Sequence, residues 1–229
     1  MTYVVPAPAV VSVPVLGKPE RFPVNRIYCV GRNYVEHAQE MGYTGREPPF
    51  FFLKPANAIV VADPDASIPY PPKTANFHYE IELVVAIGIG GKNIAAADAA
   101  KHIYGFAVGL DMTRRDLQMD VRKQGRPWDI GKAFDHSAPC GPIVPADQIG
   151  NINEADIALT VNGATKQTSN IKKLIWNIGE VIEHLSAAWE LKPGDLIYTG
   201  TPEGVGPVVS GDLMVGSVSG LPSISVKVA

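Results

Sequence analysis

Two glutamates stand inside an apolar stretch of the sequence. HYEIELVVAIG (residues 78–88) carries Glu80 and Glu82 among apolar residues and predicts a strand. Alternate side chains of a strand share a face, so both carboxylates are expected on the side that also carries Val84. At that spacing their repulsion is about 2 kcal/mol for an effective dielectric constant near 20. Either this face is solvated and the glutamates are ordinary surface charges, or a divalent cation binds between them.

A third acid favours the cation. Asp111 ends a second apolar stretch, YGFAVGLD (residues 104–111), where its short side chain would face a site. Three carboxylates form an all-oxygen set that suits Mg²⁺, with Mn²⁺ or Ca²⁺ as alternatives, and disfavours zinc. The sequence has no HExxH motif and no paired cysteines, the usual signatures of zinc sites. We therefore predict a metal site formed by Glu80, Glu82 and Asp111.

A histidine and a glutamate form a second candidate for chemistry. GRNYVEHAQEM (residues 31–41) predicts a short helix over residues 34–41 with Asn33 as its N-cap. His37 and Glu40 are three residues apart and would share a helix face. A histidine oriented by a carboxylate is a competent general base near neutral pH. The alternative is an ordinary ion pair on the helix surface.

Composition narrows the class of protein. The 229 residues are 46% hydrophobic and 19% charged, with a formal net charge of −3, which favours one globular domain and no nucleic-acid or polybasic membrane surface. No apolar run reaches about 18 residues, so no transmembrane helix is expected. The proline-interrupted start, which lacks a basic region, is a poor signal peptide. Cys29 and Cys140 are expected as buried free thiols, and the protein as cytoplasmic.

The elements that must position these residues are mostly short strands. They do not alternate regularly with helices, which predicts an α+β fold rather than a doubly wound sheet. Helices are expected over residues 95–103, 113–125 and 175–191, and the pair Asn162-Gly163 predicts a hairpin turn. Residues 1–24 contain five prolines and are interpreted as an extended arm, before a single catalytic domain over residues 25–229.

Taken together, these stretches resemble a known family. The chain is similar to the fumarylacetoacetate hydrolase family, in its short single-domain branch, which includes acylpyruvate hydrolases. The resemblance covers about residues 26–208 and implies a strand-rich fold with mixed β-sheets in a roll and few helices. The stretches that carry it, in the order of the family, are CVGRNYVEHAQEM, FFLKP, HYEIELVVAIG, YGFAVGLDMTRRDLQ, GRPWDIGKAFDHSAPCGP and LKPGDLIYTGTPEGVGPV.

The resemblance also implies roles for individual residues. It implies Mg²⁺ or Mn²⁺ at the three carboxylates, a catalytic pair on a mobile lid, and a cationic group beside the metal. It further points to three substrate contacts. The implied metal ligands are Glu80, Glu82 and Asp111, the catalytic pair is His37 and Glu40, the cation is Lys132, and the substrate contacts are Arg32, Gln118 and Thr201.

The implied activity is metal-dependent hydrolysis of a carbon–carbon bond in an acylpyruvate. The favoured substrate is fumarylpyruvate, cleaved to fumarate and pyruvate in gentisate catabolism, by a homodimer. Another acylpyruvate, the decarboxylation or tautomerisation of oxaloacetate, and non-catalytic binding of a small 2-oxo acid are the alternatives. The intact pair His37 and Glu40 favours hydrolysis, because the oxaloacetate reactions need no attacking water.

Overall fold

The computed structural model describes residues 2–35 and 46–229. His37, Glu40 and most of the helix predicted over residues 34–41 lie outside this range. In the described part of the chain, no helix is both long enough and apolar enough to cross a membrane.

Strands predominate, as predicted, and the α-helices in the described residues are short. The helices are α2 (Arg115–Lys123), α3 (Asp129–Lys132) and α4 (Ile178–Ala188), with 3-10 turns η1 (Ala56–Ala58), η2 (Ala96–His102), η3 (Ala146–Gln148), η4 (Ile152–Glu154) and η5 (Ile171–Lys173). The strands are β1 (Ser12–Pro14), β2 (Arg21–Pro23), β3 (Ile27–Gly31), β4 (Phe50–Lys54), β5 (Ile59–Val61), β6 (Asp65–Ile68), β7 (Phe77–Tyr79), β8 (Ile81–Ile87), β9 (Ile103–Leu110), β10 (Thr113–Arg114), β11 (Ala138–Cys140), β12 (Val144–Pro145), β13 (Asp156–Val161), β14 (Ala164–Asn170), β15 (Leu196–Tyr198), β16 (Gly206–Val208), β17 (Leu213–Val218) and β18 (Ile224–Val228).

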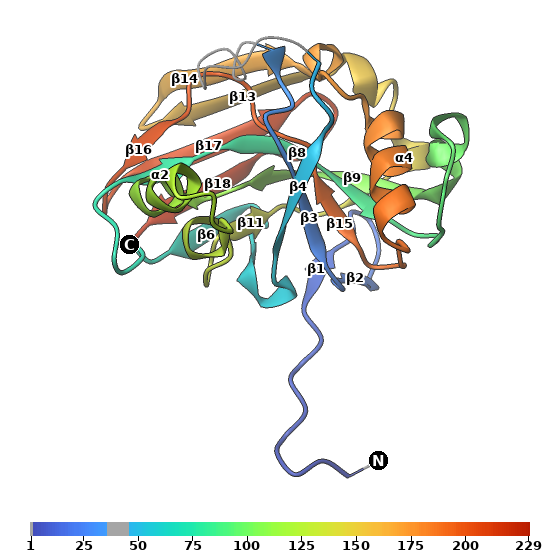
Figure 1. Cartoon of the computed structure of the whole chain (residues 1–229), viewed down its shortest axis with the longest axis horizontal. Helices are drawn as coiled ribbons and strands as arrows, with labels where there is room; N and C mark the ends of the chain where they lie inside the picture. The colour runs from blue at the N-terminus through green and yellow to red at the C-terminus, as the bar shows by residue number, and fades with distance from the viewer. Residues whose placement is uncertain (1, 36–45) are drawn as a thin grey trace.

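Two large sheets form the body of the molecule (Figure 1). An eight-stranded sheet runs in the order β4-β3-β15-β8-β9-β11-β5, with β12 beside β9. It mixes parallel pairs, such as β15 with β3, and antiparallel pairs, such as β8 with β9. A five-stranded sheet, β14-β13-β17-β18-β6, contacts it through β13 and β17. This arrangement confirms the prediction of an α+β fold with mixed sheets and few helices.

Strand β8 is buried on both faces, and its side chains alternate between two apolar cores. Leu83 and Val85 join the core that also holds Ile157 and Leu159 of β13, between the two sheets. Val84 belongs to the second core, which lies on the other face of the large sheet. This alternation follows from the two-residue repeat of a strand. It places the even-numbered side chains of β8, Glu82 among them, on the face of the second core.

Several local predictions are confirmed, and two are corrected. Asn162 and Gly163 both have positive φ and connect β13 to β14, as a two-residue hairpin turn requires. Helices α2 and α4 occupy predicted stretches, whereas residues 96–102 form a 3-10 turn instead of a regular helix. The stretch 78–88 is two strands rather than one. Strand β7 pairs with β10 and β16 in a separate sheet, and Glu80 lies at the break before β8.

The N-terminal segment has an exposed part and a packed part. Residues 2–10 run away from the body of the molecule (Figure 1), whereas Val11 packs against the second core. Strands β1 and β2 form a small antiparallel sheet, in which Val13 and Phe22 are buried in the second core. The second half of the segment therefore helps to cover the face of the large sheet that carries Val84 and Glu82.

Four strands of the large sheet bring their ends to one edge. Strand β8 is antiparallel to β9 and β15, and β15 is parallel to β3. The start of β8 therefore lies beside the ends of β3, β9 and β15. Residues that follow these three strands in the sequence, among them Asn33, Asp111 and Gly200, meet at the first residues of β8.

Candidate active site

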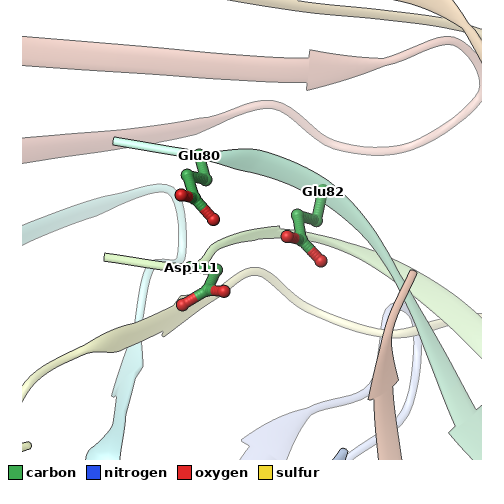
Figure 2. A group of neighbouring side chains, drawn as sticks. All are labelled: Glu80, Glu82 and Asp111. Carbon is green, nitrogen blue, oxygen red and sulfur yellow. The ribbon is translucent and has the colours of Figure 1, made fainter. Parts of the chain in front are cut away.

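Three buried carboxylates meet at this edge, as the sequence predicted (Figure 2). Glu80 precedes β8, Glu82 is its second residue, and Asp111 directly follows β9. The Asp111 N–H donates to the Glu80 carbonyl at 2.8 Å, which fixes the two segments side by side. One carboxylate oxygen from each residue lies within 4.8 Å of the others, and all three side chains are buried. The interpretation of the glutamates as ordinary surface charges is therefore wrong.

Buried cations surround two of the three carboxylates. Lys132 Nζ donates to Glu80 Oε2 at 2.6 Å and to Asp111 Oδ2 at 2.7 Å. Arg115 donates to the other oxygen of Glu80. Lys54 Nζ lies 2.9 Å from Asp111 Oδ1. That contact is an ion pair without hydrogen-bond geometry.

Glu82 is held differently. In the described part of the chain its carboxylate receives one hydrogen bond, from the Gly200 N–H to Oε2 at 2.8 Å. Burial, followed by the charges of Asp111 and Glu80, raises the pKa of Glu82 well above the ordinary value. Burial by itself would lower the pKa of Lys132. The negative charges of Asp111 and Glu80 have the larger combined effect, so this pKa is raised. Glu82 is therefore the carboxylate whose charge the surrounding protein compensates least.

These features fit a divalent cation. The donors are carboxylate oxygens on separate segments, which is the set that Mg²⁺ and Mn²⁺ prefer. Among the described residues, Asp111 Oδ1 has an ion pair but no hydrogen bond, and Glu82 makes no ion pair. A divalent ion between the carboxylates would remove the repulsion that the protein leaves uncompensated.

The predicted substrate contacts line the same cavity as the carboxylates. Arg32, Gln118 and Thr201 lie in its wall together with Lys132. The guanidinium of Arg32 stacks over Phe50, 5.0 Å from the ring centroid, and Arg32 has a φ of 57° directly after β3. All the predicted site residues in the described part of the chain therefore meet at one place. His37 and Glu40 lie outside that part.

Two further polar residues of the site were not predicted. Arg115 is the first residue of α2 and donates to both Glu80 and Gln118. Lys54 is the last residue of β4, and its Nζ donates to the carbonyls of Met112 and Lys132. Each lies in a stretch that carried the family resemblance, TRRDLQ for Arg115 and FFLKP for Lys54. A lysine at the end of an aromatic strand is a usable signal for a buried charge, because lysine is seldom buried unless it is paired.

Two buried side-chain amides support the segment over residues 199–202. Gln167 of β14 accepts from the Ile81 N–H at 3.0 Å, and its amide nitrogen donates to Thr201 Oγ1 at 2.9 Å. Asn33 donates to the Thr199 carbonyl at 2.8 Å. No sequence pattern pointed to Gln167, because it lies in an otherwise polar strand. Asn33 was predicted as a helix cap, whereas its side chain bonds to distant segments.

Comparison with known proteins places this site in a family. The family model for the C-terminal part of fumarylacetoacetate (FAA) hydrolase matches residues 26–229. A fumarylpyruvate hydrolase from a Ralstonia species is 51% identical over 182 residues, which is 80% of this chain and 93% of that protein. An oxaloacetate tautomerase of Escherichia coli is 38% identical over 192 residues, 83% of this chain and 87% of that protein.

A solved structure matches the fold closely. Fumarylpyruvate hydrolase from Pseudomonas aeruginosa, crystallised in complex with Mn²⁺ and pyruvate, is 53% identical. The match has a TM-score of 0.95 and covers 100% of this chain and 99% of that one. The family model spans most of the chain, and these identities are far above the level at which only a fold is shared. The chain belongs to the fumarylacetoacetate hydrolase family.

Proposed function

We propose that the protein is a metal-dependent hydrolase that cleaves fumarylpyruvate into fumarate and pyruvate. The observation that carries the proposal is the buried cluster of Glu80, Glu82 and Asp111 in a chain that matches, over its whole length, a fumarylpyruvate hydrolase bound to Mn²⁺ and pyruvate. Water adds to the acyl carbonyl, the bond between the acyl carbon and C3 of the pyruvyl unit breaks, and C3 takes up a proton.

The charges of the site suit an anionic substrate. In the described part, the three carboxylates face three cations, Lys54, Arg115 and Lys132, so the cluster is formally balanced. Bound Mg²⁺ or Mn²⁺ supplies two further positive charges, polarises the 2-oxo group and stabilises the negative charge that develops on the pyruvyl unit. With the metal and with Arg32, which lines the same cavity, the described site residues would carry a formal net charge of about +3, which favours a dicarboxylate substrate.

Lys132 and the neighbouring polar residues have roles that follow from their positions. Lys132 is held by Glu80 and Asp111, whose charges raise its pKa, so a cation lies beside the proposed metal site and would stabilise the enolate of the leaving group. Gln118 and Thr201 line the cavity and offer hydrogen bonds that orient the carboxylate and keto groups. Arg32 adds a cation at the cavity wall beside Phe50.

The attacking water needs a base, and we assign that role to His37 oriented by Glu40. Both lie outside the described residues, so the assignment depends on the sequence resemblance. His37→Ala should abolish pyruvate release and leave the affinity for Mn²⁺ near that of the unmodified protein. A loss of Mn²⁺ binding in this variant would mean that His37 is misassigned.

The proposed function is tested by turnover of a substrate panel. Fumarylpyruvate, acetylpyruvate and oxaloacetate are supplied with Mg²⁺ and then with a chelator, and two products are measured: pyruvate, and the enol form of oxaloacetate as it interconverts with the keto form. We expect rapid release of pyruvate from fumarylpyruvate that stops when the metal is removed. Faster conversion of oxaloacetate would instead favour the oxaloacetate reactions, which the E. coli tautomerase makes the second candidate. Binding without turnover of any member would indicate a binder of 2-oxo acids.

The proposal also includes the oligomeric state and the cellular compartment of the enzyme. We expect a homodimer, which the molar mass from light scattering would test. We also expect the cytoplasm as its compartment, because Cys29 and Cys140 are buried free thiols that suit a reducing environment.

A further inference from the structure

Asn33 lies next to the metal site, and no step of the proposed chemistry uses it. Its side chain is fully buried, and it follows β3 at the edge where the carboxylates meet. We infer that Asn33 is a positioning residue for Glu82 and acts through the peptide group that joins Thr199 to Gly200. The inference rests on the metal site of the proposed function.

The contacts form a continuous chain. Asn33 Nδ2 donates to the Thr199 carbonyl at 2.8 Å, and the Gly200 N–H donates to Glu82 Oε2 at 2.8 Å. That carbonyl and that N–H belong to the same peptide group. Each hydrogen bond polarises the group in the direction that strengthens the other. The amide of Asn33 thus fixes the orientation of the donor that Glu82 receives.

Glu82 depends on this donor more than the other two carboxylates depend on any single partner. Lys132 holds both Glu80 and Asp111, and Arg115 adds a second cation to Glu80. In the described part of the chain, the Gly200 N–H is the hydrogen-bond donor to Glu82. Groups that orient a metal ligand from behind tune the affinity for the metal without touching it.

Further hydrogen bonds hold Thr199 and the side chain of Asn33 in place. The Thr199 N–H and hydroxyl both donate to the Leu83 carbonyl, at 3.1 and 2.9 Å, which ties the segment to β8. Asn33 is itself fixed, because its Oδ1 accepts from the Trp176 N–H at 2.8 Å and its Nδ2 also donates to the Trp176 carbonyl at 3.0 Å. The asparagine therefore holds one orientation.

Glycine at position 200 permits this close approach. Gly200 has a φ of 102°, a conformation that side chains strongly disfavour. A Cβ there would lie 2.7 Å from the Cβ of Asn33. The fit between Asn33 and Gly200 thus requires the smallest residue at one position and a side-chain amide at the other.

Asn33→Asp removes the amide donor and keeps the shape, and Asn170→Asp is the matched control. Asn170 also donates two hydrogen bonds, to the Glu154 carbonyl at 2.9 Å and to Asp156 Oδ1 at 2.8 Å, but far along the sequence on β14. Calorimetry gives the Mn²⁺ affinity of each metal-free protein. Hydrogen exchange of the Gly200 amide is followed by NMR on protein labelled with ¹⁵N-glycine.

Asn33→Asp should weaken Mn²⁺ binding by about 10- to 100-fold and accelerate exchange of the Gly200 amide, whereas Asn170→Asp changes neither. Should Asn33→Asp fail to fold, the uncharged Asn33→Ser replaces it, with the same expectation. Unchanged Mn²⁺ affinity and unchanged Gly200 exchange would overturn the inference and leave the proposed function intact. Conversely, the expected losses in a protein that releases no pyruvate would support the role of Asn33 and overturn the proposed function.

Discussion

Strands β8 and β14 treat buried polar side chains in opposite ways. All seven residues of β8 are buried, and its one carboxylate, Glu82, lies between apolar neighbours. Most of β14 is exposed or half-buried, and its single buried residue is Gln167. Glu82 is a candidate metal ligand, whereas Gln167 bonds to Ile81 and Thr201 from behind. A charged residue such as Glu82 can be recognised from the sequence because its strand is otherwise apolar. A buried polar residue such as Gln167 cannot, because the rest of its strand is polar too.

The largest expected effect comes from replacing Glu82, the carboxylate of β8. Glu82→Gln should lower kcat/KM for fumarylpyruvate by about 10³-fold, because metal assistance contributes several kcal/mol and each 1.4 kcal/mol is tenfold in rate. Initial rates at saturating Mn²⁺ measure it. The matched control is Glu154→Gln, at an exposed position remote in sequence, which should retain full activity. Equal activity of the two variants would show that the carboxylate in β8 is not a metal ligand.

A buried lysine behind the carboxylates should affect stability strongly. Lys54→Met removes one of the two buried cations beside Asp111, which keeps Lys132, and leaves the carbonyls of Met112 and Lys132 without this donor. We expect the free energy of unfolding to fall by about 3–5 kcal/mol, the usual cost of breaking a buried pair. Chemical denaturation checks this, with Lys166→Met on the exposed face of β14 as the control. A loss as small as that of the control would mean that the pair contributes nothing.

Replacing Gln167, the buried residue of β14, should have an intermediate effect. Gln167→Ala leaves the Ile81 N–H without its acceptor and Thr201 without its donor, so stability should fall by about 1–3 kcal/mol. Because Thr201 lines the cavity, KM should rise as well. The neighbouring Thr168→Ala, at an exposed position, should change stability by less than about 0.5 kcal/mol. Equal losses in the two variants would remove the contrast between the strands.

The smallest expected effect is a change with pH. The raised pKa of Glu82 favours its neutral form in the folded metal-free protein, so this stabilising contribution is present at low pH and is lost as pH rises through the raised pKa. Metal binding needs the carboxylate and releases the proton. The increase in Tm on adding Mn²⁺ should therefore grow as pH rises above the ordinary range of a glutamate. An increase that is independent of pH would contradict the protonated state of Glu82.

The cluster of three carboxylates was predicted from the sequence because its signal is local. Two glutamates in an apolar run and an aspartate after another are visible without knowledge of the fold, since charge in such stretches is costly. The hairpin at Asn162-Gly163 and the amphipathic helix α4 were also predicted correctly, because each has a local sequence pattern. The single strand predicted over residues 78–88 was wrong, because apolar periodicity alone does not show that the chain changes sheets at Glu80.

The supporting residues were missed because their partners are distant in the sequence. Asn33 bonds to residues 143 and 166 positions away, and Gln167 bonds to Ile81, 86 positions away. Lys54 reaches Asp111 only because β4 and β9 belong to one sheet. Such contacts depend on sheet order and register, which composition and periodicity do not specify.

The most direct test of the account is the position of bound Mn²⁺. A crystal grown with excess Mn²⁺ would be measured near the manganese absorption edge, and the anomalous map would locate the ion. We expect one strong peak in contact with the carboxylates of Glu80, Glu82 and Asp111. A peak elsewhere, or these three side chains turned toward different surroundings at saturating Mn²⁺, would contradict it.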